Sequence, residues 1–194
     1  MIEPVLRRKV LRPRPAERPA VGSALARALP RAVLRAFSAG AGLTAQTGPA
    51  TDRRLPLDEA LDLIDDDGFL ALLSGPGQPG AGALAILDAG LFAALIEALT
   101  LGRLGPAPAG PARRPTATDA ALLGAVIDRL LADLDRALRE GGGAEGGLDG
   151  PWQLARGLAD PRLLGAILDD GVYRLAQVPV TLVDATGGTG RAGR

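Results

Sequence analysis

The chain has 194 residues, of which 47% are hydrophobic but only 3% aromatic, and its 22 basic residues balance 22 acidic ones. It contains no cysteine, no histidine and only one lysine, which excludes disulfides, thiol nucleophiles, imidazole catalysis and nearly all zinc chemistry. The zero net charge also argues against a nucleic-acid partner, and the length suits one domain with an aliphatic core.

Residues 1–20 combine six basic side chains with four prolines, a composition that buries too little surface to offset its ordering entropy. We predict a flexible basic tail, or alternatively a docking peptide for an acidic partner. No apolar stretch follows the basic residues, so a secretion signal is not expected and the chain should stay in the cytoplasm. The most apolar stretch, residues 83–99, contains Asp88 and Glu97, which argues against a membrane helix.

The first predicted helix begins at Ser23. Its apolar positions recur every fourth residue and share one face: Leu25, Leu29, Val33 and Phe37. Pro30 is expected to kink this helix or to mark a second start, because it lacks an amide proton. Gly40 and Gly42 are expected to end it.

A short polar strand is predicted within residues 43–51, followed by a helical segment or turn over 57–64. Next come two apolar runs of strand length, Phe69–Leu73 and Ala83–Leu87. The glycines and prolines of residues 75–80 are expected to form the turn between them, which predicts a hairpin.

The middle of the chain predicts two amphipathic helices. The first covers residues 91–99 and is ended by Gly102, after which a loop rich in Pro and Gly is expected. The second begins at Thr116 or Thr118, either of which can cap it. Its wide apolar face is formed by Leu122, Leu123, Val126, Ile127, Leu130, Leu131, Leu134 and Leu138.

Two charge pairs on this second helix, Arg129 with Asp133 and Asp135 with Arg139, have the i,i+4 spacing of surface ion pairs. We assign both pairs to the solvated side of the helix.

The last quarter of the chain predicts a glycine-rich linker over 141–150, a helical turn over 160–168, and one or two strands over 172–183. It also contains a faint internal echo. Asp-Asp-Gly precedes an expected strand at residues 66–68 and again at residues 169–171. This echo suggests an internally duplicated α/β domain.

No chemical site is predicted. The aspartates of residues 65–67 and of residues 169–170 lack the ligand spacing of a calcium loop, so solvated turns are favoured over a metal site. No phosphate-binding loop and no activated serine is present, and we therefore predict no catalytic, cofactor-binding or metal-binding residue. Trp152 is interpreted either as a partner anchor or as a core residue, and the same alternatives apply to Glu97 and Thr100.

The central order of elements carries a resemblance. A strand ends at Asp88, a helix follows over 91–99, and Gly102 and a Pro/Gly loop lead to Arg114-Pro115-Thr116-Ala117-Thr118-Asp119 at the start of a long helix. This order resembles the middle domain of FliM-type flagellar motor switch proteins. The resemblance covers residues 21–190 and implies a three-layer α/β fold of the CheC/CheX/FliM kind, with helices packed on a β-sheet and pseudo-twofold symmetry. Residues 191–194 would form a tail, without the FliN-like domain that follows in the family.

The same resemblance implies a non-enzymatic component of the C ring, which takes part in torque transmission and in control of rotation direction. It would lie at the cytoplasmic face of the inner membrane without inserting, and contact a FliG-type rotor protein, FliN-type subunits and neighbouring copies of itself. The matching partner-binding residues are Gly102, Arg103, Leu104, Gly105, Arg114 and Thr116. A basic tail replaces the acidic N-terminal peptide with which many FliM proteins bind phosphorylated CheY, so CheY binding is not expected.

Three alternatives remain open. A type III secretion sorting-platform protein is related to FliM and FliN and would share these features. A CheC-like chemotaxis protein would be inactive, because the chain contains no asparagine to orient the attacking water. An interaction domain of an unrelated α/β fold is the remaining alternative.

Overall fold

The computed structural model describes residues 22–64, 67–76, 78–106, 113–141, 151–158, 160–183 and 191–193. The tail predicted over 1–20 and all but the first residue of the linker predicted over 141–150 lie outside these ranges. The elements follow in the order α1 (Ala24–Ala41), β1 (Thr44–Thr47), β2 (Thr51–Pro56), α2 (Leu57–Leu61), β3 (Phe69–Gly75), β4 (Gln78–Leu87), α3 (Ala89–Leu101), α4 (Ala117–Glu140), β5 (Gln153–Leu158), the 3-10 turn η1 (Pro161–Leu163), α5 (Leu164–Ile167), β6 (Val172–Gln177), β7 (Val180–Val183) and β8 (Arg191–Gly193).

The strands pair in three small antiparallel groups. Their orders are β1-β7-β8, β2-β6 and β4-β3-β5. Strand β3 is central in the last group, and residues 69–73 are buried one after another, because both faces of this strand are covered. The apolar run that predicted β3 is therefore the signature of a strand inside a layered fold.

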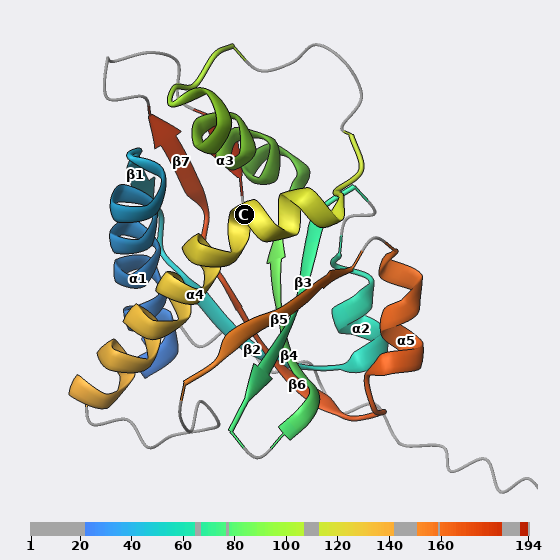
Figure 1. Cartoon of the computed structure of the whole chain (residues 1–194). Coiled ribbons are helices and arrows are strands. Elements are labelled where there is room, and N and C mark those ends of the chain that lie inside the picture. The colour runs from blue at the N-terminus through green and yellow to red at the C-terminus, as the bar shows by residue number, and fades with distance from the viewer. Residues whose placement is uncertain are drawn as a thin grey trace, which may run out of the picture.

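Helices cover the strands from two sides (Figure 1). Phe69, Ala71 and Leu73 of β3 face the large core that α1, α3 and α4 complete. Leu70 and Leu72 face a smaller core that α2 and α5 complete. The predicted three-layer α/β fold, with helices packed on sheet, is confirmed.

The strand pairing shows an internal duplication. The succession β2-α2-β3-β4 recurs as β5-α5-β6-β7, and the two units exchange strands, because β2 pairs with β6 while β5 pairs with β3. Strands β3 and β6 each begin directly after the glycine of the repeated Asp-Gly turn, at Phe69 and at Val172. The echo seen in the sequence thus marks equivalent positions of a pseudo-twofold domain.

The predicted ends of the long helices are confirmed by their caps. The Ser23 hydroxyl accepts a hydrogen bond from the Ala26 amide at 3.0 Å, and Gly42 ends α1 with φ 63°. Gly40, which was also expected to end the helix, lies inside its last turn. Pro30 lies inside α1. Of the two threonines proposed to start α4, the structure uses Thr116.

Strand β4 differs from the sequence prediction at its start. Pro79 and Gly80 were expected in the turn, but β4 already begins at Gln78, and Gly75 is paired with Gln78. Because β4 lies at the edge of its sheet, a proline there removes no hydrogen bond of a central strand. The hairpin itself is confirmed.

One of the two charge pairs of α4 was also placed wrongly. The Asp133 side chain is only 2% exposed, and it accepts hydrogen bonds from Arg129, at 3.1 Å, and from Arg136. Two arginines compensate the buried charge. The pair of Asp135 and Arg139 lies on the surface as predicted, with a 3.0 Å contact and a 64% exposed arginine side chain.

Residues 191–193, which the sequence analysis placed in a tail, pair with β7 as β8. Among the helices of the described ranges, none combines the length and apolar character needed to cross a membrane.

Candidate protein-binding site

The C-terminal end of α3 is shaped by Gly102. This residue adopts a left-handed conformation with φ 67°, and its amide donates to the Ala98 carbonyl at 2.8 Å. The chain then turns so that Arg103 is exposed and Leu104 is buried in the large core. The helix end therefore presents a short, anchored loop.

A side chain of α3 itself fixes the far end of this loop. The Gly105 amide donates a 2.6 Å hydrogen bond to Glu97 Oε1, and a Cβ atom at Gly105 would lie 2.9 Å from the same oxygen. The Thr100 hydroxyl donates to the Ile96 carbonyl at 2.7 Å. Both polar residues, for which the sequence left a partner-binding role open, thus make local contacts at the end of the helix.

The start of α4 is organised around Asp119, which is 4% exposed. Arg113 binds its carboxylate in a bidentate way, with Nη2 to Oδ1 at 2.6 Å and Nη1 to Oδ2 at 2.7 Å. The Thr116 amide also donates to Asp119 at 2.8 Å, and the Thr116 hydroxyl accepts from the Asp119 amide, which completes a capping box. The hydrogen bonds from Arg113, helped by those from Thr116, hold the pKa of Asp119 well below its usual range despite its burial.

Arg113 also ties α4 to α3. Its guanidinium lies over the Phe92 ring, 5.3 Å from the centroid, and Phe92 in turn stacks on Phe69 with centroids 5.8 Å apart. Sequence reasoning selected the neighbouring Arg114, because the resemblance matched that position. The only sign of Arg113 in the sequence is its place next to Arg114. Its contacts with Asp119 and Phe92 form only when the chain folds.

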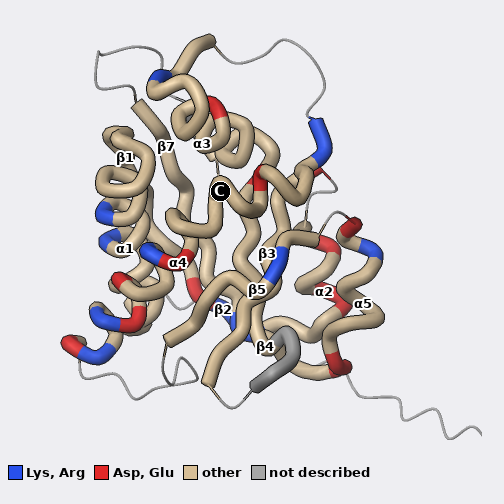
Figure 2. The backbone as a smooth tube through the Cα atoms, in the orientation of Figure 1, with Lys and Arg blue, Asp and Glu red and all other residues tan. Residues whose placement is uncertain are grey.

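The six predicted partner-binding residues fall into two groups at the two ends of α3. Gly102–Gly105 follow its C-terminal end, whereas Arg114 and Thr116 lie near its N-terminal end, where Arg113 contacts Phe92. Gly102 follows Phe92 by ten positions, which corresponds to about 15 Å along the helix axis. Basic residues mark both places in Figure 2. We call these two groups together the α3–α4 surface.

Exposure distinguishes the members of the α3–α4 surface. Arg103, Arg114 and Thr116 are exposed together with Gly102, whereas Leu104 is only 6% exposed. Leu104 is therefore a packing residue that anchors the loop. The exposed part of this surface therefore consists of guanidinium groups and backbone.

Trp152 lies in the core and not on this surface. It is 9% exposed, and its ring packs so closely on Gly75 that a Cβ there would lie 2.6 Å from Cε2. This placement agrees with the interpretation of Trp152 as a core residue.

The acidic turns show no arrangement for a metal. Asp67, Asp169 and Asp170 are exposed, while Asp65 and Asp66 lie outside the described residues. Within the part of the chain that the structure describes, no group of three or more His, Cys, Asp or Glu could hold a metal ion.

No protein-family model and no curated protein matches the sequence. Solved structures do match. The FliM middle domain from Vibrio alginolyticus has a TM-score of 0.58 at 14% identity, with 87% of this chain and 89% of that chain covered. A chain of the FliG–FliM complex from H. pylori gives 0.60 at 11%, with 87% of each covered. The chain has the fold of a FliM middle domain. FliY from Thermotoga maritima matches with a TM-score of 0.56 at 10% identity, covering 87% and 84%.

This similarity confirms the fold that the central order of elements predicted. Within this fold, the residues of the α3–α4 surface lie at the end of α3 and at the start of α4 (Figure 1). At these identities the similarity concerns the architecture.

Proposed function

We propose that the chain is a structural and signalling component of the bacterial flagellar motor switch, the C ring, at the cytoplasmic face of the inner membrane. In this role it takes part in torque transmission and in control of rotation direction through protein contacts and without catalysis. The observation that carries the proposal is the FliM-like fold, which extends over 87% of the chain in the FliM middle domain match.

The proposed partners are a FliG-type rotor protein, FliN-type subunits and neighbouring copies of the chain. A FliG partner is supported by the match to the H. pylori complex that contains FliG and FliM. For this contact we propose the exposed members of the α3–α4 surface, Arg103 and Arg114, with Gly102, Gly105 and Thr116 shaping the backbone around them. Leu104 contributes by anchoring the loop in the core.

The domain limits suggested by the sequence support the same proposal. We propose that the FliM-middle-like unit begins at residue 21 and, beyond the limit of 190 expected from the sequence, includes residues 191–193, which pair with β7, with the basic segment 1–20 as a separate tail. The basic character of that segment does not suit the capture of phosphorylated CheY by an acidic peptide, so CheY is not among the proposed partners.

The test is an isothermal calorimetric titration of the purified chain with the FliG-type protein encoded in the same genome. The variant Arg103→Glu reverses one exposed charge of the α3–α4 surface, and Arg31→Glu makes the same change on the exposed side of α1. We expect saturable binding that Arg103→Glu weakens at least tenfold, about 1.4 kcal/mol, while Arg31→Glu binds like the wild type. A folded chain that does not bind at all would contradict the proposal and favour a secretion-platform or CheC-like role.

A further inference from the structure

The layer of α2, η1 and α5 carries a concentration of negative charge. Six exposed acidic residues belong to these elements and to the turns beside them: Asp58, Glu59, Asp62, Asp67, Asp169 and Asp170. Within α2, η1 and α5 the single basic residue is Arg162, which lies 3.5 Å from Asp160. Red segments accordingly predominate on this side in Figure 2.

Folding brings the two acidic segments together. The Leu57 amide at the start of α2 donates a 3.1 Å hydrogen bond to the Gly171 carbonyl, so the turn with Asp169 and Asp170 lies against α2. The Tyr173 hydroxyl donates to the Asp169 carbonyl at 2.7 Å. Burial raises the pKa of Tyr173, and the charges of Asp169 and Asp170 raise it further.

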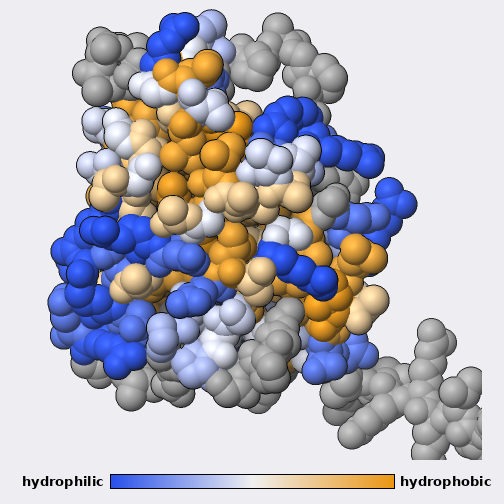
Figure 3. Space-filling view, viewed as in Figure 1, coloured by the Kyte–Doolittle hydropathy of each residue, from blue (hydrophilic) through white to orange (hydrophobic). Residues whose placement is uncertain are grey.

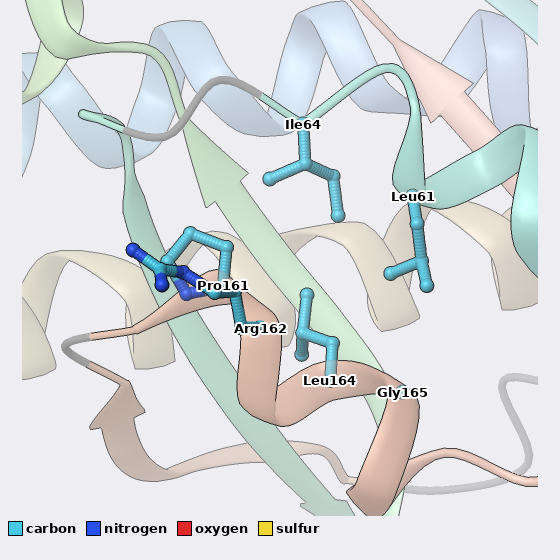
Figure 4. A pocket seen from close by; sticks show the side chains of 6 residues that line it. All are labelled: Leu61, Ile64, Pro161, Arg162, Leu164 and Gly165. Atoms are coloured by element: carbon cyan, nitrogen blue, oxygen red, sulfur yellow. The ribbon is translucent and has the colours of Figure 1, made fainter.

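A pocket of about 230 Å³ opens between the α2 side and the η1–α5 side of this layer (Figure 4). Leu61 and Ile64 line it from the α2 side, and Leu164 and Pro161 line it from the opposite side. Arg162 and Gly165 complete its wall.

Exposed aliphatic side chains also occur next in sequence to residues that line the pocket. Among the described residues, two of the five exposed large hydrophobic side chains belong to this layer, Leu63 at 44% just after α2 and Leu163 at 49% in η1, and a third, Val172 at 70%, begins β6 directly after the acidic turn. Single exposed leucines are ordinary, but exposed aliphatic residues beside a pocket lined by further aliphatic side chains indicate a binding surface. Figure 3 shows the apolar area over α2 and α5 with hydrophilic residues around it. We call the pocket, together with the exposed acidic and aliphatic residues of α2, η1, α5 and the turns beside them, the α2–α5 surface; its acidic residues are its acidic rim.

The chemistry of the α2–α5 surface fits a basic segment that also carries aliphatic residues. Residues 1–20 of the same chain have this composition. Their basic side chains are Arg7, Arg8, Lys9, Arg12, Arg14 and Arg18, against two acidic ones, and Ile2, Val5, Leu6, Val10 and Leu11 are interspersed. Opposite charges around an apolar contact provide both attraction and orientation.

The segment is also long enough and starts in the right place. Ser23, which caps α1, hydrogen-bonds the Asp52 carboxyl on β2, and β2 leads directly into α2. From Asp52 to Leu57 the strand advances about 17 Å. Residues 14–21 can span up to about 26 Å when extended, which leaves residues 2–13 to reach the pocket.

We propose that the α2–α5 surface is the docking site of residues 2–13 of the same chain, with aliphatic side chains in the pocket and arginines on the acidic rim. This inference is independent of the proposed motor role. Docking would hold the basic segment on the domain at moderate salt and release it at high salt.

The absence of cysteine allows a direct test in the full chain, because two introduced cysteines are the only ones labelled. Nitroxides on Leu6→Cys and Leu163→Cys report the distance between segment and pocket by double electron–electron resonance. The control pair is Leu6→Cys with Leu122→Cys, since Leu122 is 38% exposed on α4, in the opposite helical layer. Dilution with unlabelled chain removes distances between different molecules.

We expect a short and narrow distance for the Leu163 pair and a broad distribution for the Leu122 pair. The short distance should be lost in 1 M salt, where the Debye length falls to about 3 Å. It should also be lost in the double variant Asp58→Asn with Asp62→Asn, which removes two exposed charges. A broad distribution for both pairs overturns the proposal, as does a short distance that vanishes on dilution or that persists in both high salt and the charge variant.

Discussion

The layer of α1, α3 and α4 and the layer of α2 and α5 cover opposite faces of the same strands with very different amounts of structure. The first contains helices of 18, 13 and 24 residues, whereas α2 and α5 have five and four. Isolated helices this short are not stable in water, so α2 and α5 depend on the sheet beneath them. The long layer therefore supplies most of the core, and the short layer leaves aliphatic residues at the surface.

Deleting one buried leucine from each layer measures this difference. Leu95 in α3 and Leu164 in α5 are both 0% exposed. We expect Leu95→Ala to lower the free energy of unfolding by about 4 kcal/mol and Leu164→Ala by about 2 kcal/mol, because the small core beside an open pocket relaxes more easily. Urea unfolding followed by circular dichroism gives both values. Equal losses of unfolding free energy in the two variants would show that both layers contribute equally to stability.

A glycine pair sharpens the comparison at the level of packing. A Cβ at Gly75 would meet Trp152 at 2.6 Å, whereas nothing lies within 4 Å of a Cβ at Gly165 in α5. We expect Gly75→Ala to destabilise the fold by about 2 kcal/mol, because the ring must shift. Gly165→Ala should instead be neutral or stabilise by up to about 1 kcal/mol. Thermal unfolding of both variants tests this, and a stable Gly75→Ala variant would argue against the tight ring contact.

The capping box of Asp119 and Thr116 at the start of α4 has no counterpart at the start of α2, whose cap residue Pro56 makes no side-chain hydrogen bond. We expect Asp119→Asn to lower the free energy of unfolding by about 1.5 kcal/mol at pH 7, since the capping box and the Arg113 contact are weakened. The loss should be measured by urea unfolding.

The same variant carries a pH signature. The folded state lowers the pKa of Asp119, so its stabilising effect is complete above the ordinary aspartate pKa near 4 and is lost as the pH falls through the lowered value. The wild type should therefore lose more stability than Asp119→Asn between about pH 5 and pH 2. The pKa of Asp52 is also lowered, chiefly by its hydrogen bonds with Arg174. Because Asp52 is present in both the wild type and the variant, its contribution cancels in the comparison. Parallel acid profiles would contradict the assignment.

The smallest expected effect concerns the loop after α3. Removing the Glu97 carboxylate abolishes the 2.6 Å hydrogen bond from the Gly105 amide. We expect Glu97→Ala to destabilise by about 1 kcal/mol and to speed hydrogen exchange at Gly105. Unchanged exchange there would mean that Leu104 alone holds the loop.

The sequence predicted the long layer better than the short one for a physical reason. Apolar positions three and four residues apart, with Ser23 and Thr116 as caps and Gly42 and Gly102 as ends, define α1, α3 and α4 locally. Strand β5 was missed because its sequence contains Gly157 and its pairing with β3 joins distant parts of the chain.

The candidate site was predicted only in part. The resemblance correctly placed a loop after α3 and the start of α4 near Thr116. It could not show that Arg103 is exposed whereas Leu104 is buried. Nor could it show that Arg113, and not Arg114, binds Asp119 and Phe92, because these contacts depend on how two helices meet. The α2–α5 surface could not be predicted from the sequence, because its two acidic segments meet only through the fold, where Leu57 hydrogen-bonds Gly171.

Hydrogen–deuterium exchange of the full chain, alone and saturated with the FliG-type protein, tests the central claim most directly. If the α3–α4 surface is the rotor-protein contact, protection should appear at residues 98–106 and 113–119, while α2 and α5 exchange as before. Protection confined to α2 and α5, or no protection at all at saturation, would contradict the assignment.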